Sequence, residues 1–128
     1  MARLVAKGYD QVPGVDFKFN FAPVTTEVTL RILLVLWIIN DHFAEVADVK
    51  TTFLHGDLDE EIYINLPEGY KEFLEKEFGE TTNGSYLSLE KALYGLVQAA
   101  RQWFLKLTNK LKNEMGFDQF SNDSCLFK

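Results

Sequence analysis

The sequence predicts an α+β fold in which short strands and two long helices alternate without a regular βαβ rhythm. Two apolar stretches, residues 27–40 and 96–115, have the length of helices, and shorter alternating stretches are typical of strands. The chain has 128 residues, 47% of them hydrophobic and 14% aromatic, which suffices for the core of one small domain. The longest apolar run, residues 32–39, is shorter than the ~18 residues that cross a membrane, so a soluble intracellular chain is expected.

The N-terminal third is expected to begin with a strand over residues 3–6, which runs into a turn at Gly8. A second turn is expected at residues 11–14, where proline and glycine are adjacent. Thr25-Thr26-Glu27 then offers an N-cap, and the apolar stretch behind it predicts a helix of about 13–15 residues that ends near Asn40-Asp41. Because this helix is apolar nearly all round, we expect it to be buried on most faces.

Three short stretches in the middle of the chain are predicted to be strands, over residues 43–49, 61–66 and 86–89. The first of these strands is expected to enter the core. The dipeptide Asn83-Gly84 is typical of a tight turn, which would connect the other two strands as a hairpin.

The C-terminal third is dominated by an amphipathic pattern. Apolar residues recur every three or four positions from Leu96 to Met115, with lysines off the stripe. This pattern predicts a helix of about 18 residues that closes at Gly116, its C-cap. Residues 125–127 begin a further apolar run, which is predicted to be a strand.

The charge of the chain is unevenly distributed. A net charge of −6 is unusual for a nucleic-acid binder, which generally presents a basic surface. Residues 57–90 hold ten acidic and two basic groups (−8), whereas residues 1–56 carry −1 and residues 91–128 carry +3. A solvated insertion explains the acidic segment, and neither flank would repel a phosphate backbone.

Asp48 is the first candidate for chemistry, since a carboxylate in an apolar strand must be paired, hydrogen-bonded, exposed at a strand end or bound to a cation. The turn expected at residues 50–52 would offer free backbone N–H groups beside it. A metal ion and a phosphate could sit together at such a place. The alternative interpretation of Asp48 is a structural cap or a surface acid.

The turn before the amphipathic helix is the second candidate. Gly95 permits close approach of a backbone or a ligand, and helix N-termini favour anions. Gln98, Arg101 and Gln102 lie in the first turns and could reach a phosphate or a base. Alternatively, Gly95 only makes the turn and Tyr94 packs in the core.

Other kinds of chemistry are excluded by residue type and spacing. His42 and His55 have no carboxylate or cysteine at the spacing of zinc ligands. Cys125 is the single cysteine, which excludes an internal disulfide. Nucleophile-elbow, phosphate-loop and dinucleotide-binding motifs do not occur.

An ordered set of motifs spans essentially the whole chain. It comprises Arg3-Leu4-Val5-Ala6-Lys7-Gly8-Tyr9, Gly14-Val15-Asp16-Phe17, Phe21-Ala22-Pro23-Val24, Asp48-Val49-Lys50-Thr51-Thr52-Phe53-Leu54, Pro67-Glu68-Gly69-Tyr70 and Leu93-Tyr94-Gly95-Leu96. Each motif is weak alone, but their order and spacing together are specific. The set resembles the reverse transcriptase (RNA-dependent DNA polymerase) of copia-type LTR retrotransposon Pol polyproteins.

The resemblance implies a right-hand polymerase, with fingers at residues 1–42 and a partial palm at residues 43–128 that carries an acidic insertion near residues 68–84. It also implies a Pol polyprotein context, an RNA/DNA template–primer and dNTPs as partners, and no membrane. Cytoplasmic retrotransposon particles are the expected location, with the nucleus as the alternative.

The family uses two Mg²⁺ ions to activate a primer 3′-hydroxyl and to stabilise the leaving pyrophosphate. The resemblance assigns Asp48 as the first catalytic aspartate and a metal ligand, and the carbonyl of Val49 as the neighbouring metal ligand. Thr51 and Thr52 match positions whose amides hold the incoming triphosphate. Phe53 matches the aromatic steric gate that selects deoxynucleotides.

The same resemblance implies four further nucleotide-binding positions. Tyr94 and Gly95 match the segment that lines the nucleotide pocket. Arg3 and Lys7 lie in the fingers region that contacts the triphosphate.

The chain also departs from the family pattern. Val97 and Ala100 stand where a lysine and a proline are common, and Ala47 replaces a larger apolar residue. The Tyr-Val-Asp-Asp hairpin, which carries the second catalytic carboxylate motif, is absent from these residues, so the resemblance stops before it. Asp48 and one carbonyl cannot hold two Mg²⁺ ions, and we therefore expect no polymerisation by the isolated chain.

Two alternatives stay open at this point. The first is a captured, non-catalytic nucleic-acid- or protein-binding module, for which the acidic segment favours a protein partner. The second is a decayed reading frame with no selected function.

Overall fold

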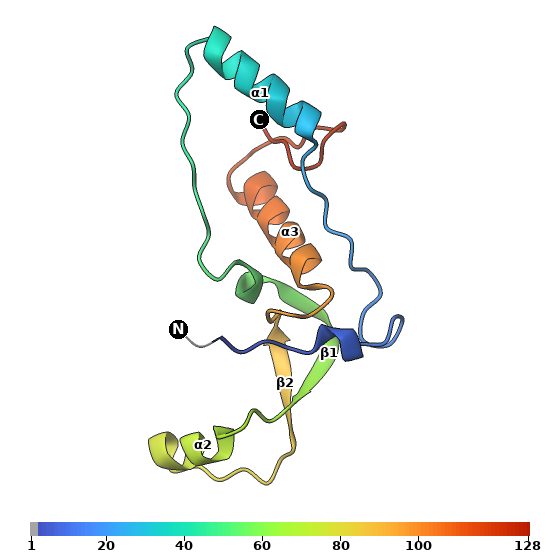
Figure 1. Cartoon of the computed structure of the whole chain (residues 1–128), viewed down its shortest axis with the longest axis vertical. Coiled ribbons are helices and arrows are strands. Elements are labelled where there is room, and N and C mark those ends of the chain that lie inside the picture. The colour runs from blue at the N-terminus through green and yellow to red at the C-terminus, as the bar shows by residue number, and fades with distance from the viewer. Residues whose placement is uncertain (1–2) are drawn as a thin grey trace.

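The computed structural model describes residues 3–128 and confirms the α+β class (Figure 1). The helices are α1 (Glu27–Ile39), α2 (Tyr70–Phe78) and α3 (Ala99–Asn109), and the strands are β1 (Asp57–Asn65) and β2 (Tyr86–Lys91). Short 3-10 turns lie at Gly8–Asp10 and Thr52–His55, and a π-helical turn lies at Lys110–Glu114. The elements follow one another along an elongated molecule, with α1 at one end and α2 at the other (Figure 1).

The two strands form an antiparallel sheet in which Ile62 lies opposite Leu89. The strands expected over residues 61–66 and 86–89 are confirmed, although β1 already begins at Asp57. The expected tight turn at Asn83-Gly84 is wrong, because α2 and its flanking loops lie between the two strands.

Helix α2 forms because the acidic segment also has apolar residues at helical spacing. The rings of Tyr70 and Phe73 lie 6.5 Å apart, and those of Phe73 and Phe78 lie 5.9 Å apart. Gly79, at φ +68°, ends the helix with its amide donating to the carbonyl of Glu75. The acidic insertion is therefore a short amphipathic helix with charged flanks.

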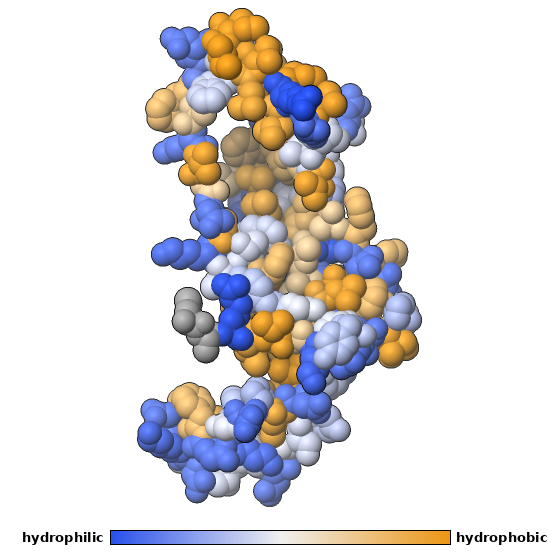
Figure 2. All heavy atoms as spheres, in the orientation of Figure 1, coloured by the Kyte–Doolittle hydropathy of each residue, from blue (hydrophilic) through white to orange (hydrophobic). Residues whose placement is uncertain are grey.

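Helix α1 has the predicted bounds but not the predicted burial. The side-chain oxygen of Thr26 accepts from the amide of Thr29 at 3.1 Å, and the helix ends before Asn40, as expected. No residue of α1 is buried, and its large apolar side chains range from 40% exposed at Leu33 to 74% at Ile38. The expected burial is wrong because α1 lies at the end of the molecule, where apolar atoms form its surface (Figure 2).

Three stretches expected to be strands are not strands in the structure. Residues 3–6 and 43–49 are extended without belonging to a sheet, and Phe43 and Val46 are more than 90% exposed. Residues 125–127 form only an isolated bridge, between Gln119 and Phe127. These stretches have strand composition, but no neighbouring strand among residues 3–128 pairs with them.

The core lies where α3 meets the sheet and the N-terminal segment. Its buried members are Ile62 of β1, Ala92, Leu96 and Ala99. Helix α3 continues through the π-helical turn to a positive-φ Gly116, which confirms the long C-terminal helix in outline. Within residues 3–128, no helix has the length and apolar character that a membrane crossing requires.

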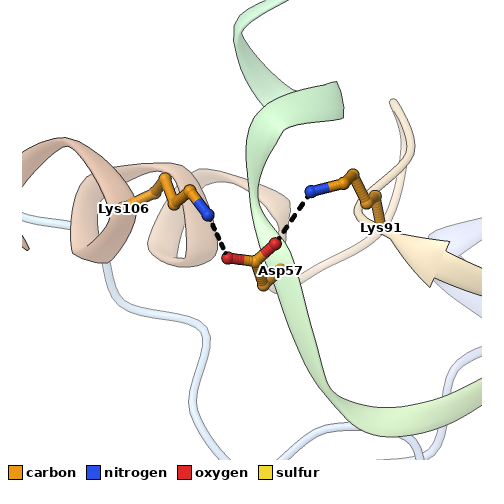
Figure 3. Close-up of polar contacts among 3 residues, drawn as sticks. All are labelled: Asp57, Lys91 and Lys106. Atoms are coloured by element: carbon orange, nitrogen blue, oxygen red, sulfur yellow. Dashed lines mark hydrogen bonds and ion pairs between the residues drawn. The ribbon is translucent and has the colours of Figure 1, made fainter. Parts of the chain in front are cut away.

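Asp57 joins three elements at the start of β1 (Figure 3). Its carboxylate accepts from the ammonium groups of Lys106 on α3 and of Lys91 on β2, the latter at 2.9 Å. Lys106, followed by Lys91, lowers the pKa of Asp57 from 3.8 to about 2. All three side chains are about half exposed, so these ion pairs stabilise the fold only slightly.

Candidate functional site

Three of the residues predicted to bind a nucleotide lie together, although they come from three separate segments. The ring of Phe53 meets the ring of Tyr94 edge to face, with centroids 5.3 Å apart and planes at 66°. The Cζ atom of Arg3 lies 4.7 Å from the centroid of the Tyr94 ring, which is a cation–π distance. We refer to Arg3, Phe53 and Tyr94 as the aromatic cluster.

A close crossing of two backbone segments positions the aromatic cluster. Gly95 has φ +92°, and a Cβ atom there would lie closer than 3.0 Å to the carbonyl oxygen of Ala6. A Cβ atom on Gly8 would overlap the carbonyl oxygen of Gly95 in the same way. The amide of Ala6 donates to the carbonyl of Tyr94 at 2.7 Å. Gly95 therefore both makes the turn and admits a second backbone.

Asp48 does not lie in a formed metal site. It belongs to the exposed extended segment before the Thr52–His55 turn, and it makes no hydrogen bond or ion pair with another described residue. Across residues 3–128, no group of three or more His, Cys, Asp or Glu side chains is placed to hold a metal ion. The sequence pattern identified the acidic residue, but this part of the chain does not supply further carboxylates beside it.

The turn after Asp48 forms as expected. Thr51 has φ +53°, and the hydroxyl of Thr52 donates to the carbonyl of Val49 at 2.6 Å. Neither the amide of Thr51 nor that of Thr52 donates to another described residue. Two N–H groups thus remain available beside the aromatic cluster residue Phe53, as an anion would require.

Lys7 is not brought into the aromatic cluster. Together with Gln11 and Ile62, it lines a separate cavity of about 430 Å³ between the N-terminal segment and the sheet. No member of the aromatic cluster lines this cavity.

The polar side chains at the start of α3, which from the sequence could reach a phosphate or a base, bond to other parts of the fold. Gln98 is fully buried, and the amide nitrogen of Gln102 donates to a carboxylate oxygen of Asp59 at 2.9 Å. The guanidinium of Arg101 donates to the carbonyl of Phe21 at 3.4 Å. Polar residues at a helix start are typical of ligand contacts, but here other parts of the fold use their hydrogen-bonding groups.

A second cavity, of about 490 Å³, has an almost entirely apolar lining and was not predicted. It lies between α1, α3 and the C-terminal segment. Its lining includes Pro23, Leu33, Phe53, Trp103 and Leu126. No sequence pattern indicates this cavity, because its walls come from elements whose packing is set only in three dimensions.

Asp123 is a buried polar residue that the sequence analysis missed. Its carboxylate accepts from the hydroxyl of Thr25 at 2.8 Å, from the amide of Thr26 at 3.3 Å and from the amide of Cys125 at 2.9 Å. The Cys125 amide, followed by the Thr25 hydroxyl, lowers the pKa of Asp123 from 3.8 to about 2. An aspartate that bonds to the amide two residues on is an Asx turn, which the Asp-Ser-Cys sequence could have indicated.

The comparison with protein families identifies the class of the chain. Residues 1–128 match the family described as "Reverse transcriptase (RNA-dependent DNA polymerase)". The chain belongs to this family, and its curated relatives are copia-type retrotransposon Pol polyproteins. The resemblance inferred from the motifs is confirmed.

Three relatives show how far the similarity extends. The chain is 41% identical to the retrovirus-related Pol polyprotein from transposon TNT 1-94 of Nicotiana tabacum, over 99% of this chain and 9% of the relative. It is 39% identical to the Pol polyprotein from transposon RE1 of Arabidopsis thaliana, over 98% of this chain and 8% of the relative. It is 28% identical to the transposon Ty1-DR4 Gag-Pol polyprotein of Saccharomyces cerevisiae, over 99% of this chain and 7% of the relative.

The chain therefore spans less than a tenth of the length of these relatives, and it is a fragment of the reverse transcriptase domain of such a polyprotein. No solved structure matches it significantly.

Proposed function

We propose that this chain supplies the dNTP-binding surface and the first catalytic aspartate of an RNA-directed DNA polymerase. The observation that carries the proposal is the aromatic cluster, in which Arg3, Phe53 and Tyr94 converge from distant segments. Membership of the reverse transcriptase family supports a nucleotide as the ligand.

Each side chain of the aromatic cluster has a distinct role in this proposal. The guanidinium of Arg3 presents a planar set of donors that suits the triphosphate. The ring of Phe53, held edge to face by Tyr94, limits the space at the sugar and excludes a 2′-hydroxyl. The free amides of Thr51 and Thr52 add donors for the phosphates, and Lys7 and Gly95 complete the proposed set.

The proposed metal site is incomplete within this chain. Reverse transcriptases generally use divalent metal ions, and we assign the carboxylate of Asp48 and the carbonyl of Val49 as the ligands contributed here. These groups do not fit a pair of Mg²⁺ ions, because each ion needs near-octahedral oxygen coordination and no further carboxylates within residues 3–128 join them. The remaining ligands belong to other parts of the polyprotein.

Membership of the family supports a wider context for the proposal. We propose that residues 1–42 form the fingers, and that residues 43–128 form part of the palm with an acidic insertion at residues 68–84. The template–primer would be an RNA/DNA hybrid, and cytoplasmic retrotransposon particles would be the location.

The test of nucleotide binding is a titration that needs no catalysis. The ¹H and ¹³C resonances of the Tyr94 ring are followed by NMR while dATP or ATP is added to the chain. We expect dATP to shift these resonances at a concentration about tenfold lower than ATP, a ratio within reach of steric exclusion of one hydroxyl. Phe53→Ala should remove the preference, whereas Phe73→Ala, on the distant α2, should keep it. Equal responses to dATP and ATP in the unchanged chain would contradict the role of Phe53.

We further propose that the isolated 128-residue chain does not polymerise DNA. An RNA template with a DNA primer, Mg²⁺ and all four dNTPs should give no extension. Extension that Asp48→Ala abolishes would contradict this proposal, since it would show that these residues alone hold both ions.

A second candidate function is a non-catalytic module that binds another protein. The observation in its favour is α1, whose apolar side chains are exposed along the whole helix. Large exposed apolar surfaces mark interaction sites. Binding of a specific protein partner through α1, without any response to dATP, would favour this function over the polymerase proposal.

A further inference from the structure

A pair of side-chain amides, one fully buried and one partly buried, connects the N-terminal segment to the start of α3. Gln98 is fully buried, and a buried amide must find hydrogen-bond partners. Its oxygen accepts from the Nε2 group of Gln11 at 3.0 Å, and its own nitrogen donates to the carbonyl of Asp16 at 3.1 Å. Neither partner is near Gln98 in sequence, so these bonds are purely tertiary.

The side-chain oxygen of Gln11 also accepts a hydrogen bond from the turn that carries Gln98. Its Oε1 atom accepts from the backbone amide of Val97 at 2.8 Å. Gln11 and Gln98 therefore make three hydrogen bonds, which we call the amide latch, between the loop at residues 8–17 and the turn at residues 97–98.

The loop that the amide latch holds has its own internal bonds. The amide of Val12 donates to a carboxylate oxygen of Asp16 at 2.6 Å, and the amide of Gly14 donates to the carbonyl of Phe17 at 2.8 Å. Because these hydrogen bonds hold the loop together, the contacts of Gln11 also restrain the backbone that runs from the loop toward the N-terminus.

Arg3 lies on that backbone and depends on it. Between the amide latch and Arg3, the chain crosses Gly95 at Gly8, and its one backbone hydrogen bond to another segment runs from the amide of Ala6 to the carbonyl of Tyr94. Arg3 itself is exposed, and its stacking on Tyr94 is weak at an exposed site. Its position over the ring must therefore come from how the segment behind it is anchored.

We propose that Gln11 and Gln98 are positioning residues, which hold Arg3 over Tyr94 and so preorganise the triphosphate contact of the nucleotide site. The placement of Arg3 by the amide latch does not depend on any nucleotide, whereas its consequence for nucleotide affinity rests on the proposed function. The chemical class of ligand is a deoxynucleoside triphosphate.

The first experiment measures the position of Arg3 without any nucleotide. Protons of the Arg3 side chain above the Tyr94 ring are expected to show an upfield ring-current shift by NMR, which Tyr94→Leu should remove. Gln11→Met and Gln98→Met should each remove it as well, while the amide resonances of β1 and β2 stay in place. Gln119→Met is the matched control, because Gln119 also bonds a backbone carbonyl, that of Ser124 at 2.7 Å, but lies far along the chain.

Two results would overturn the amide latch. One is an unchanged Arg3 shift in Gln11→Met, which is the safer variant because Gln11 is only partly buried. The other is an equal loss of the shift in Gln119→Met, which would show that any lost hydrogen bond loosens the cluster.

The second experiment tests the consequence for binding, with dATP as the probe. Gln11→Met should weaken dATP binding about tenfold, the factor expected when a charged hydrogen bond is lost. In an Arg3→Ala background, Gln11→Met should have no further effect, because it acts through Arg3. If the losses of dATP affinity in Gln11→Met and Arg3→Ala were additive in the double variant, the positioning role would be overturned. If the unchanged chain does not bind dATP while Gln11→Met still displaces Arg3, the proposed function fails and the placement of Arg3 by the amide latch stands.

Discussion

The crossing of Gly8 and Gly95 allows a sharp prediction about Gly95→Ala. Two separate effects act at this position: φ is +92°, and the added Cβ would overlap the carbonyl oxygen of Ala6. The strained backbone alone costs about 1–2 kcal/mol for a residue with a Cβ atom. Opening the crossing removes the Ala6–Tyr94 hydrogen bond, worth about 0.5–1.5 kcal/mol, and the Arg3–Tyr94 stacking, worth about 0.5–1 kcal/mol. We therefore expect Gly95→Ala to lower the free energy of unfolding by about 2–4.5 kcal/mol.

The chain offers two controls that separate these effects. Gly14 has φ +83° and no atom within 4 Å of an added Cβ, so Gly14→Ala should show only the backbone cost of about 1–2 kcal/mol. Gly8 has no positive φ, so Gly8→Ala should show only the effect of the overlap. Urea unfolding followed by circular dichroism measures all three variants. Equal destabilisation by Gly95→Ala and Gly14→Ala would refute the argument, because it would mean that the crossing contributes nothing.

Three further predictions concern charge and exposed surface. The folded-state pKa of Asp123 is lowered from 3.8 to about 2, so its contribution to stability is present above pH 4 and is lost as the pH falls toward 2. Asp123→Asn should therefore flatten the curve of unfolding free energy against pH between about pH 4 and 2. An unchanged curve would contradict the assignment. Isolated chains should associate through α1, so Ile38→Glu should lower the concentration-dependent mass in analytical ultracentrifugation while Val15→Glu, equally 74% exposed, should not. Asp57→Asn should destabilise the fold slightly at low salt and not at high salt, since its ion pairs are exposed; a salt-independent loss by urea unfolding would contradict this.

Local signals in the sequence predicted the elements that depend on local structure. The N-cap at Thr26 and the apolar stretch behind it define α1, and the strands over residues 61–66 and 86–89 follow from alternation. The burial of α1 could not be predicted in the same way, because periodicity states which residues are apolar and not what covers them. Helix α2 was missed because its charges are more conspicuous than the aromatic spacing beneath them.

The candidate site shows the same division. Phe53, Tyr94 and Arg3 were predicted from motifs, and the structure brings them together through the glycine crossing. From the sequence Gln98 could reach a phosphate or a base, but in the structure it is buried against Gln11. A polar residue at a helix start has the same sequence pattern in both cases, and only the position of the distant partner distinguishes them.

The nucleotide and metal parts of the proposed site differ in what they need in order to form. The aromatic cluster depends on contacts among three segments that all lie within the chain, and these contacts fix it without Asp48. Asp48 lies on the extended stretch at residues 43–49, whose strand-like composition has no paired neighbour among residues 3–128. An extended segment with unpaired N–H and C=O groups acquires a defined position by pairing with another strand. It follows that the proposed nucleotide contacts and the proposed metal ligation are separable: the first would depend on the crossing at Gly8 and Gly95, and the second would require a strand partner for the segment of Asp48.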